Sequence, residues 1–244
     1  MLSQINLWGE RAGMVLDLLL MLRILTLKLR QTYVFISLFV LLSLFYDGVE
    51  LLMGSETPEF RNVALLSKFV YAIVYPLVAW DLFEEAKQTV DKVRKMAMSR
   101  MMTSLLFITL WGLLIAAFTG GEDSGQSMYL MRLSIVVWTG SVASALAFLW
   151  VMRRGMKANH WDLPWNNSIW YTFFGLILLI QAIWCVLSLG LQFVIGQSPH
   201  LAETIDQDSD LVLNFFGILL TGWCTYKLRA VPSDASNVTV DVKG

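Results

Sequence analysis

The side chains that could do chemistry are carboxyl groups inside or beside long apolar stretches. Asp17 interrupts the run from Trp8 to Leu27, and a carboxyl group in lipid is protonated, paired or faces a wet cavity. A functional role and a plain hydrogen bond to another helix are equally good interpretations of it. Asp47 and Glu50 stand three apart, so they share a helix face and could form a proton or cation site. A solvated helix end is the stronger interpretation of that pair.

The remaining intramembrane candidates are Lys68, Pro76, Gln181 and Asn214. Lys68 and Pro76 belong to one apolar segment, and Pro76 removes the hydrogen bond to the carbonyl of Ala72, which predicts a kink, a hinge or a cavity near mid-membrane. Gln181 and Asn214 are amides in two later segments, where such groups hold helices together at about 0.6 kcal/mol per bond.

Basic residues form a second candidate site, on the segments that join the apolar runs. They could contact a protein partner, although a solvated helix face is the stronger interpretation. The residues concerned are Lys92, Arg94, Lys95, Arg100, Arg153 and Arg154.

Several functions are excluded by what the sequence lacks. The two histidines, His160 and His200, fall in different loops, which excludes paired haem ligands and a zinc protease site. The last apolar segment has Lys227 at its end and no lysine within it, so attached retinal is not expected. A net charge of -1 gives no reason to expect nucleic acid as a partner. No catalytic constellation, metal site or cofactor site is predicted.

The elements that position these residues are expected to be transmembrane helices. Hydrophobic residues make up 57% of the 244 and charged residues 15%, well below the roughly 25% charged of a soluble domain. Continuous apolar runs approach the length of about 20 residues that crosses a bilayer. The sequence therefore predicts an all-α, polytopic bundle of seven spans: Trp8 to Leu27, Tyr33 to Leu52, Val63 to Leu82, Met101 to Phe118, Tyr129 to Met152, Ile169 to Gly190 and Leu211 to Leu228.

Charge asymmetry predicts the orientation. Lys and Arg gather on alternate connections and on the C-terminal tail, while Asp and Glu gather on the others. The positive-inside rule places the N-terminus outside and the C-terminus in the cytoplasm. If the first segment lay flat in the interface, there would be six spans and both termini inside. We expect one membrane domain over residues 1–230 and a disordered polar cytoplasmic tail over 231–244.

Three short motifs resemble a large uncharacterised family of bacterial seven-helix membrane proteins. They are Lys28-Leu-Arg30 leading to Tyr33, then Ser67-Lys-Phe-Val-Tyr71, and Trp80-Asp-Leu-Phe83, in which Asp81 replaces the glutamate of the family pattern. The similarity extends over most of the chain. It implies a bacterial inner-membrane location and carries no established activity.

These observations together predict a non-enzymatic membrane protein of the receptor or accessory type. Its partners would be the lipid bilayer and a protein in the membrane or at the cytoplasmic loops. A small proton-coupled or ion-coupled transporter using Asp17, Asp47, Glu50 and Pro76 is the first alternative, and a structural subunit of a larger membrane complex is the second.

Overall fold

The computed structural model describes residues 2–54, 57–119, 126–195 and 215–231, and its elements in that part of the chain are helical. Asn214 and the tail beyond Val231 lie outside these residues. A short 3-10 turn, η1, follows the first helix, and one further helix covers residues 215–227. The bounds are α1 Leu2–Thr26, η1 Leu29–Gln31, α2 Val34–Met53, α3 Pro58–Asp81, α4 Lys87–Thr119, α5 Gln126–Ala158 and α6 Trp165–Ile195.

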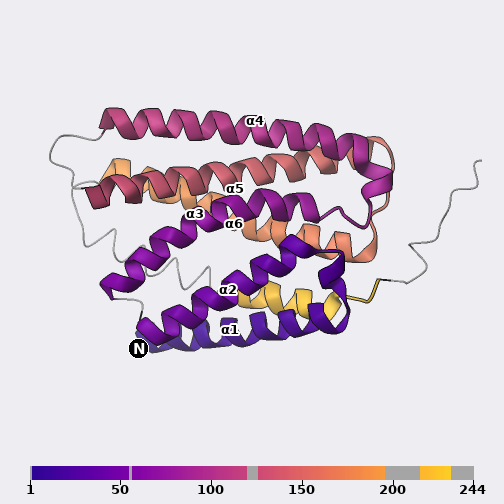
Figure 1. The fold of residues 1–244 in the computed structure, drawn as a ribbon, viewed down its shortest axis with the longest axis horizontal. Helices are drawn as coiled ribbons and strands as arrows, with labels where there is room; N and C mark the ends of the chain where they lie inside the picture. Colours follow the sequence, from indigo (N-terminus) through magenta and orange to yellow (C-terminus); the bar gives the residue numbers. More distant parts are fainter. Residues whose placement is uncertain (1, 55–56, 120–125, 196–214, 232–244) are drawn as a thin grey trace, which may run out of the picture.

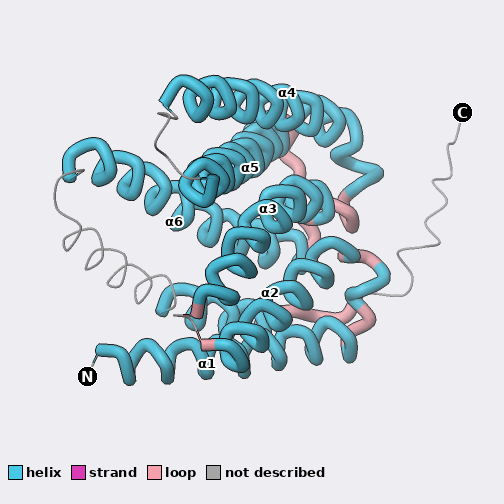
Figure 2. Tube along the Cα trace, turned by 60° about the vertical axis from the view of Figure 1, so that its left-hand side comes forward, coloured by secondary structure: helices cyan, strands magenta, loops and turns pink. Residues whose placement is uncertain are grey.

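The helices pack in the order α4, α5, α3, α2, α1, with α6 against α5; helices that follow one another in the chain are antiparallel, whereas the neighbours α3 and α5 run parallel (Figure 1 and Figure 2). The helix over 215–227 returns beside α1, where Arg23 donates a hydrogen bond of 3.0 Å to the carbonyl of Leu228. Because successive helices reverse direction, the α1–α2, α3–α4 and α5–α6 connections and residue 231 share one end of the molecule. We call this end, which carries the basic connections, the basic end.

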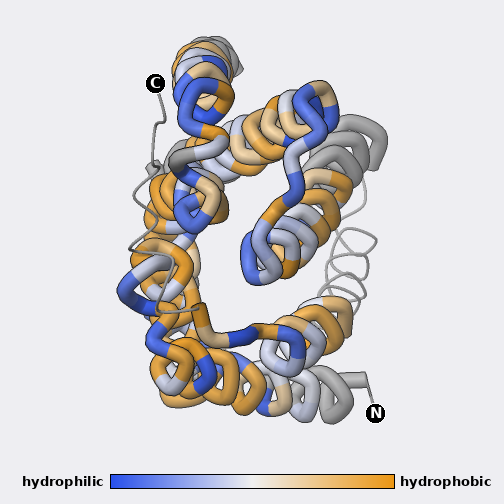
Figure 3. Tube along the Cα trace, turned by 90° about the vertical axis from the view of Figure 1, so that its right-hand side faces the viewer, coloured by the Kyte–Doolittle hydropathy of each residue, from blue (hydrophilic) through white to orange (hydrophobic). Residues whose placement is uncertain are grey.

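Four helices in the described part are long and apolar enough to cross a membrane: Val34–Met53, Asn62–Asp81, Val136–Ala158 and Trp165–Trp184. They match the predicted second, third, fifth and sixth spans. The predicted first and fourth spans are helical, and so is the stretch 215–227 of the predicted seventh, but none of them is among these four within the described residues. Viewed onto the basic end, hydrophilic segments gather at the connections and hydrophobic ones along the helices (Figure 3), a distribution that fits a membrane protein.

Pro76 lies inside α3, as the sequence predicted, and the helix continues past it to Asp81. Proline has no N–H, so the carbonyl of Ala72 loses its partner within the helix. The hydroxyl of Ser141 on α5 donates to that carbonyl at 2.6 Å. A neighbouring helix thus satisfies the backbone group that proline frees, as a low-water environment requires.

Two glycines allow α5 to approach α4 closely. A Cβ atom added at Gly155 would lie 2.5 Å from Cγ1 of Val93, and one added at Gly140 would lie 2.8 Å from Cγ2 of Ile108. Between them, the hydroxyls of Ser104 and Ser144 are hydrogen-bonded at 3.2 Å. Small residues at a helix interface gain van der Waals contact where lipid supplies no hydrophobic driving force.

We expect Gly155→Ala to lower the thermal unfolding temperature of the purified protein, because the added methyl group overlaps Val93 and such overpacking costs about 1 to 3 kcal/mol. Val93→Ala in the same chain should recover most of the loss. Gly175→Ala is the matched control, since nothing lies within 4 Å of a Cβ atom there. Equal behaviour of the Gly155 and Gly175 variants would contradict the close packing of α4 on α5.

Candidate functional site

A buried carboxylate joins two helices at the basic end. Asp81, the last residue of α3, accepts hydrogen bonds from the backbone N–H groups of Phe35 and Ile36 at 2.8 and 3.0 Å. These groups belong to the first turn of α2, where no helical partner exists. Tyr33, the residue before α2, provides no side-chain cap. Asp81 therefore caps α2 from another helix, and its negative charge suits the positive end of the α2 dipole.

Arg94 lies beside this cap and is fully buried, with 0% of its side chain exposed. Its guanidinium lies 3.7 Å from the ring centroid of Trp80 and donates to the Trp80 carbonyl at 2.9 Å. It also forms an ion pair with Glu84. Burying a charge is costly unless it is paired and hydrogen-bonded, so Arg94 fixes α4 against the end of α3. Its Nε and Nη1 atoms have no partner among the described residues.

Glu84 holds two cations at once. Lys87 binds it at 2.8 Å, and Arg94 binds its other oxygen. Burial by itself raises the pKa of Glu84, but the hydrogen bonds from Lys87 and Arg94 and the charge of Arg94 outweigh burial and hold the pKa below its usual range. The carboxylate therefore stays charged well into acid, and the ion pair with Arg94 persists at physiological pH.

Two consecutive asparagines at the start of α6 extend the network. Asn167 is fully buried and accepts a hydrogen bond from the hydroxyl of Tyr33. Asn166 donates to Glu85 at 3.2 Å and to the carbonyl of Arg229 at 2.9 Å, and it accepts from the Arg229 N–H at 3.1 Å.

The end of the helix over 215–227 is held by side chains from α1 and α6. The carbonyls of residues 227, 228 and 229 accept hydrogen bonds from Trp165, Arg23 and Asn166 respectively. The Arg229 guanidinium lies 4.1 Å from the ring centroid of Trp165. Carbonyl groups at a helix end lack partners within the helix, so this set of bonds fixes where the chain leaves the bundle.

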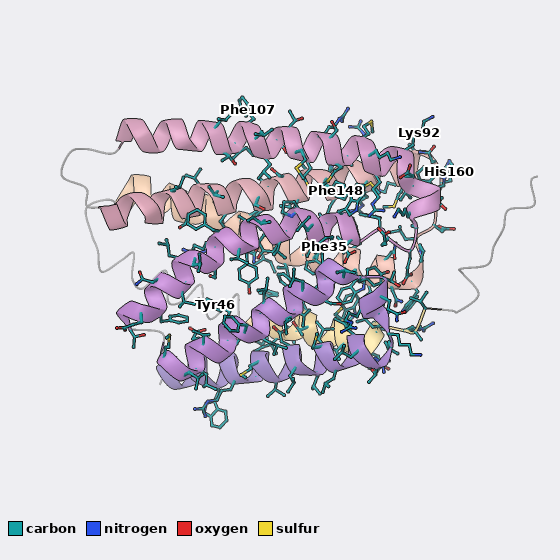
Figure 4. The ribbon with its side chains drawn as sticks, in the orientation of Figure 1. Phe35, Tyr46, Lys92, Phe107, Phe148 and His160 are labelled. Carbon is teal, nitrogen blue, oxygen red and sulfur yellow. The ribbon has the colours of Figure 1, made fainter. Side chains whose placement is uncertain are left out.

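Exposed cations surround this network. Lys92, Lys95, Arg100, Arg153 and Arg154 are exposed, as predicted. Arg94, predicted among them, is instead buried, because it turns inward to Trp80 and Glu84 where its neighbours face outward. Lys92 and His160 both lie at the end where α4 begins and α5 ends (Figure 4).

Two of the predicted intramembrane residues, Asp17 and Gln181, belong to a second cluster at mid-depth. Ser43 on α2 donates to Asp17 at 2.7 Å, and Thr221 also hydrogen-bonds the carboxyl group. Tyr71 on α3 lies close enough to Ser43 to be influenced by its hydroxyl group. Asp17 is thus partnered by hydroxyl groups from two other helices, which the sequence interpretation left open.

Two tyrosines of α3 connect this cluster to α6. The rings of Tyr71 and Tyr75 stack with centroids 6.0 Å apart, and Gln181 donates to the Tyr75 hydroxyl at 2.7 Å. Asp47 lies near enough to act electrostatically on Tyr71. Glu50 and Lys68 are half-buried. Asn214 lies outside the described residues.

Sequence reasoning missed the structural role of Asn166, Asn167 and Asp81. A signal was present for the asparagines, because two adjacent amides opening a long apolar segment next to Trp165 are unusual unless their bonds are satisfied locally. Their partners come from residues 33, 85 and 229, which no spacing within the sequence reveals.

Neither cluster has the composition of a metal centre. Among the described residues, no group of three or more His, Cys, Asp and Glu side chains could hold a metal ion. Comparison of the chain with family models, curated proteins and solved structures found no match. The functional argument therefore rests on the two clusters themselves.

We expect Arg94→Ala to destabilise the protein by about 2 kcal/mol, the scale of hydrogen bonds to a charged group. The change removes the ring contact with Trp80 and leaves the Trp80 carbonyl without its donor. Lys92→Ala, two residues away and exposed, should stay within about 0.5 kcal/mol of the parent. Chemical unfolding in detergent measures both, and equal losses would mean that Arg94 is a surface residue.

Proposed function

We propose that this chain is a non-catalytic integral membrane protein of the receptor or accessory type, whose basic end contacts a partner in the cytoplasm. One observation supports this above the others. The basic end combines a rigid, buried polar network with a rim of exposed cations, and a surface that is held in place loses little entropy when it binds.

The network links most of the helices that reach this end. Asp81 joins α3 to α2, Arg94 joins α4 to α3, and Asn166 joins α6 to the C-terminal helix end. A displacement of one helix within the bilayer would therefore move the others at this end. That is the mechanical property a receptor or accessory subunit needs, because a change in the membrane or a membrane partner must reach the cytoplasmic face.

Orientation and location are part of the proposal. The alternation of basic and acidic connections supports seven spans with the N-terminus outside, and the resemblance to bacterial seven-helix proteins supports the inner membrane. The shared end of the basic connections in the fold supports the same arrangement. Labelling of single cysteines at positions 92 and 208 tests it, because the two sites should react from opposite sides.

We expect a protein partner to co-purify at fixed stoichiometry and to be weakened by Lys92→Gln with Lys95→Gln. Exposed ion pairs are worth up to about 1 kcal/mol each, so the double variant should bind about tenfold more weakly. Lys28→Gln with Arg30→Gln is the matched control, with two exposed cations at the same end. Equal weakening by both pairs would mean that the partner recognises the general positive charge of the basic end and not α4. Retention of the partner by both variants would point to a structural subunit that binds through its spans.

The chain of contacts from Asp17 to Gln181 favours a second function, a proton-coupled carrier. A carboxyl group, three hydroxyl groups and an amide from four helices lie in sequence at mid-depth, and such groups within spans often mark proton pathways. The same bonds also serve to hold the helices together. The two roles differ in whether protons move.

Purified protein in liposomes with an imposed pH gradient distinguishes them. We expect no flux above protein-free liposomes, and Asp17→Asn should alter only thermal stability, by about 1 kcal/mol. Ser168→Ala, an exposed site on α6, controls for substitution itself. Proton flux that Asp17→Asn abolishes would replace the receptor proposal with the carrier.

A further inference from the structure

One flank of the α4–α5 pair carries exposed arginines and an exposed tryptophan. The two helices are antiparallel, and their contacts set the register: Val93 lies against Gly155, Ser104 against Ser144, and Ile108 against Gly140. Ala97 and Met101 are fully buried on the same face of α4, and Val151 is buried on α5. These residues mark the line along which the helices meet.

Four exposed residues each stand one position before a residue on this line. A step of one residue rotates the side chain by about 100° in the same sense on both helices. In an antiparallel pair, equal rotations from the contact line bring side chains to the same flank. The residues are Met96 and Arg100 on α4, with Trp150 and Arg154 on α5.

The register also gives their order along the bundle. Arg154 is level with Arg94, and Arg100 lies six residues further from the basic end, about 9 Å at 1.5 Å per residue. Trp150 is level with residue 98, between the two arginines. Long arginine side chains extend toward the polar boundary while their stems cover apolar surface, so both guanidinium groups can reach one headgroup level.

The chemistry of this flank is that of a membrane interface. Trp150 is 58% exposed and Met96 is 47% exposed. The Arg154 guanidinium lies 5.3 Å from the Trp150 ring centroid. Within the described part of the chain, neither Arg100 nor Arg154 forms an ion pair, whereas Lys95 nearby is paired with Asp91 at 2.7 Å. Two guanidinium groups that form no ion pair, beside a tryptophan ring, can bind an anionic group where the hydrocarbon layer of the membrane meets the headgroups.

We propose that Arg100, Arg154 and Trp150 form a binding site for the phosphate of an anionic phospholipid of the cytoplasmic leaflet. The guanidinium groups bind the phosphate oxygens, and the acyl chains lie along the exposed apolar flank above. A lipid fits better than a soluble anion because Trp150 and Met96 stay in contact with hydrocarbon. The inference depends on the proposed orientation of the basic end and is independent of the protein partner, whose test uses Lys92 and Lys95.

Thermal unfolding during titration with short-chain lipid tests the site. The protein in neutral detergent should gain stability with phosphatidylglycerol and not with phosphatidylcholine or inorganic phosphate. Arg100→Gln and Arg154→Gln should each weaken the apparent affinity about fivefold, since a basic residue at an anionic surface contributes about 1 kcal/mol. Arg154→Lys should retain most of the effect, and Lys92→Gln should retain all of it.

Each of the following outcomes would contradict the proposed phospholipid site. Stabilisation that survives both glutamine substitutions, or that phosphatidylcholine produces equally, would show that the flank has no headgroup preference. Stabilisation by inorganic phosphate alone would replace the lipid with a soluble anion. If the lipid effect is absent but loss of Arg154 abolishes partner co-purification, the flank belongs to the protein interface. Failure of the Lys92 and Lys95 test leaves the lipid result unaffected.

Discussion

The carboxylate of Asp81 occupies the position on which the basic end depends. A backbone N–H removed from water must find another acceptor, and the first turn of α2 has none of its own. Asp81 supplies it from the end of α3, which fixes α2 and α3 relative to one another. Arg94 then binds the carbonyl of the preceding residue, Trp80. The last turn of one helix thus satisfies polar groups on two others, and the termini of all three are held within one connected network.

The same requirement acts in the interior of the bundle. Pro76 leaves a carbonyl of α3 without its donor, and Ser141 provides one from α5. That bond requires α3 and α5 to lie close together. Gly140 and Gly155 permit a similarly close approach between α5 and α4. α5 is therefore the central helix, with small or hydroxyl-bearing residues facing both neighbours. Because α5 is central, α4 lies at the edge of the bundle. One face of α4 is buried against α5, and its other faces carry the charged side chains.

Two polar systems with different properties result. The network at the basic end contains full charges held by charged or aromatic partners, and it is rigid because most of its members have several contacts. The mid-depth cluster contains neutral hydroxyl and amide groups around Asp17, whose bonds are individually weak in membranes. The first suits the transmission of a helix displacement to a surface. The mid-depth cluster joins helices, and its carboxyl group, Asp17, is the group that would take up a proton in a carrier.

The sequence by itself determined the helical class, the apolar stretches and the alternation of charge along the connections, because each of these follows from the local composition of a continuous segment. It also identified Pro76, Asp17 and most of the exposed cations. Only the tertiary structure decided that Arg94 turns inward while Lys92 remains exposed, that Asp81 caps α2, and that Asn166 holds the end of the C-terminal helix. The roles of Arg94, Asp81 and Asn166 each depend on a partner that lies between 10 and 63 residues away along the chain. Hydropathy and spacing report which side chains need a partner, whereas the packing of the helices determines which partner each one meets.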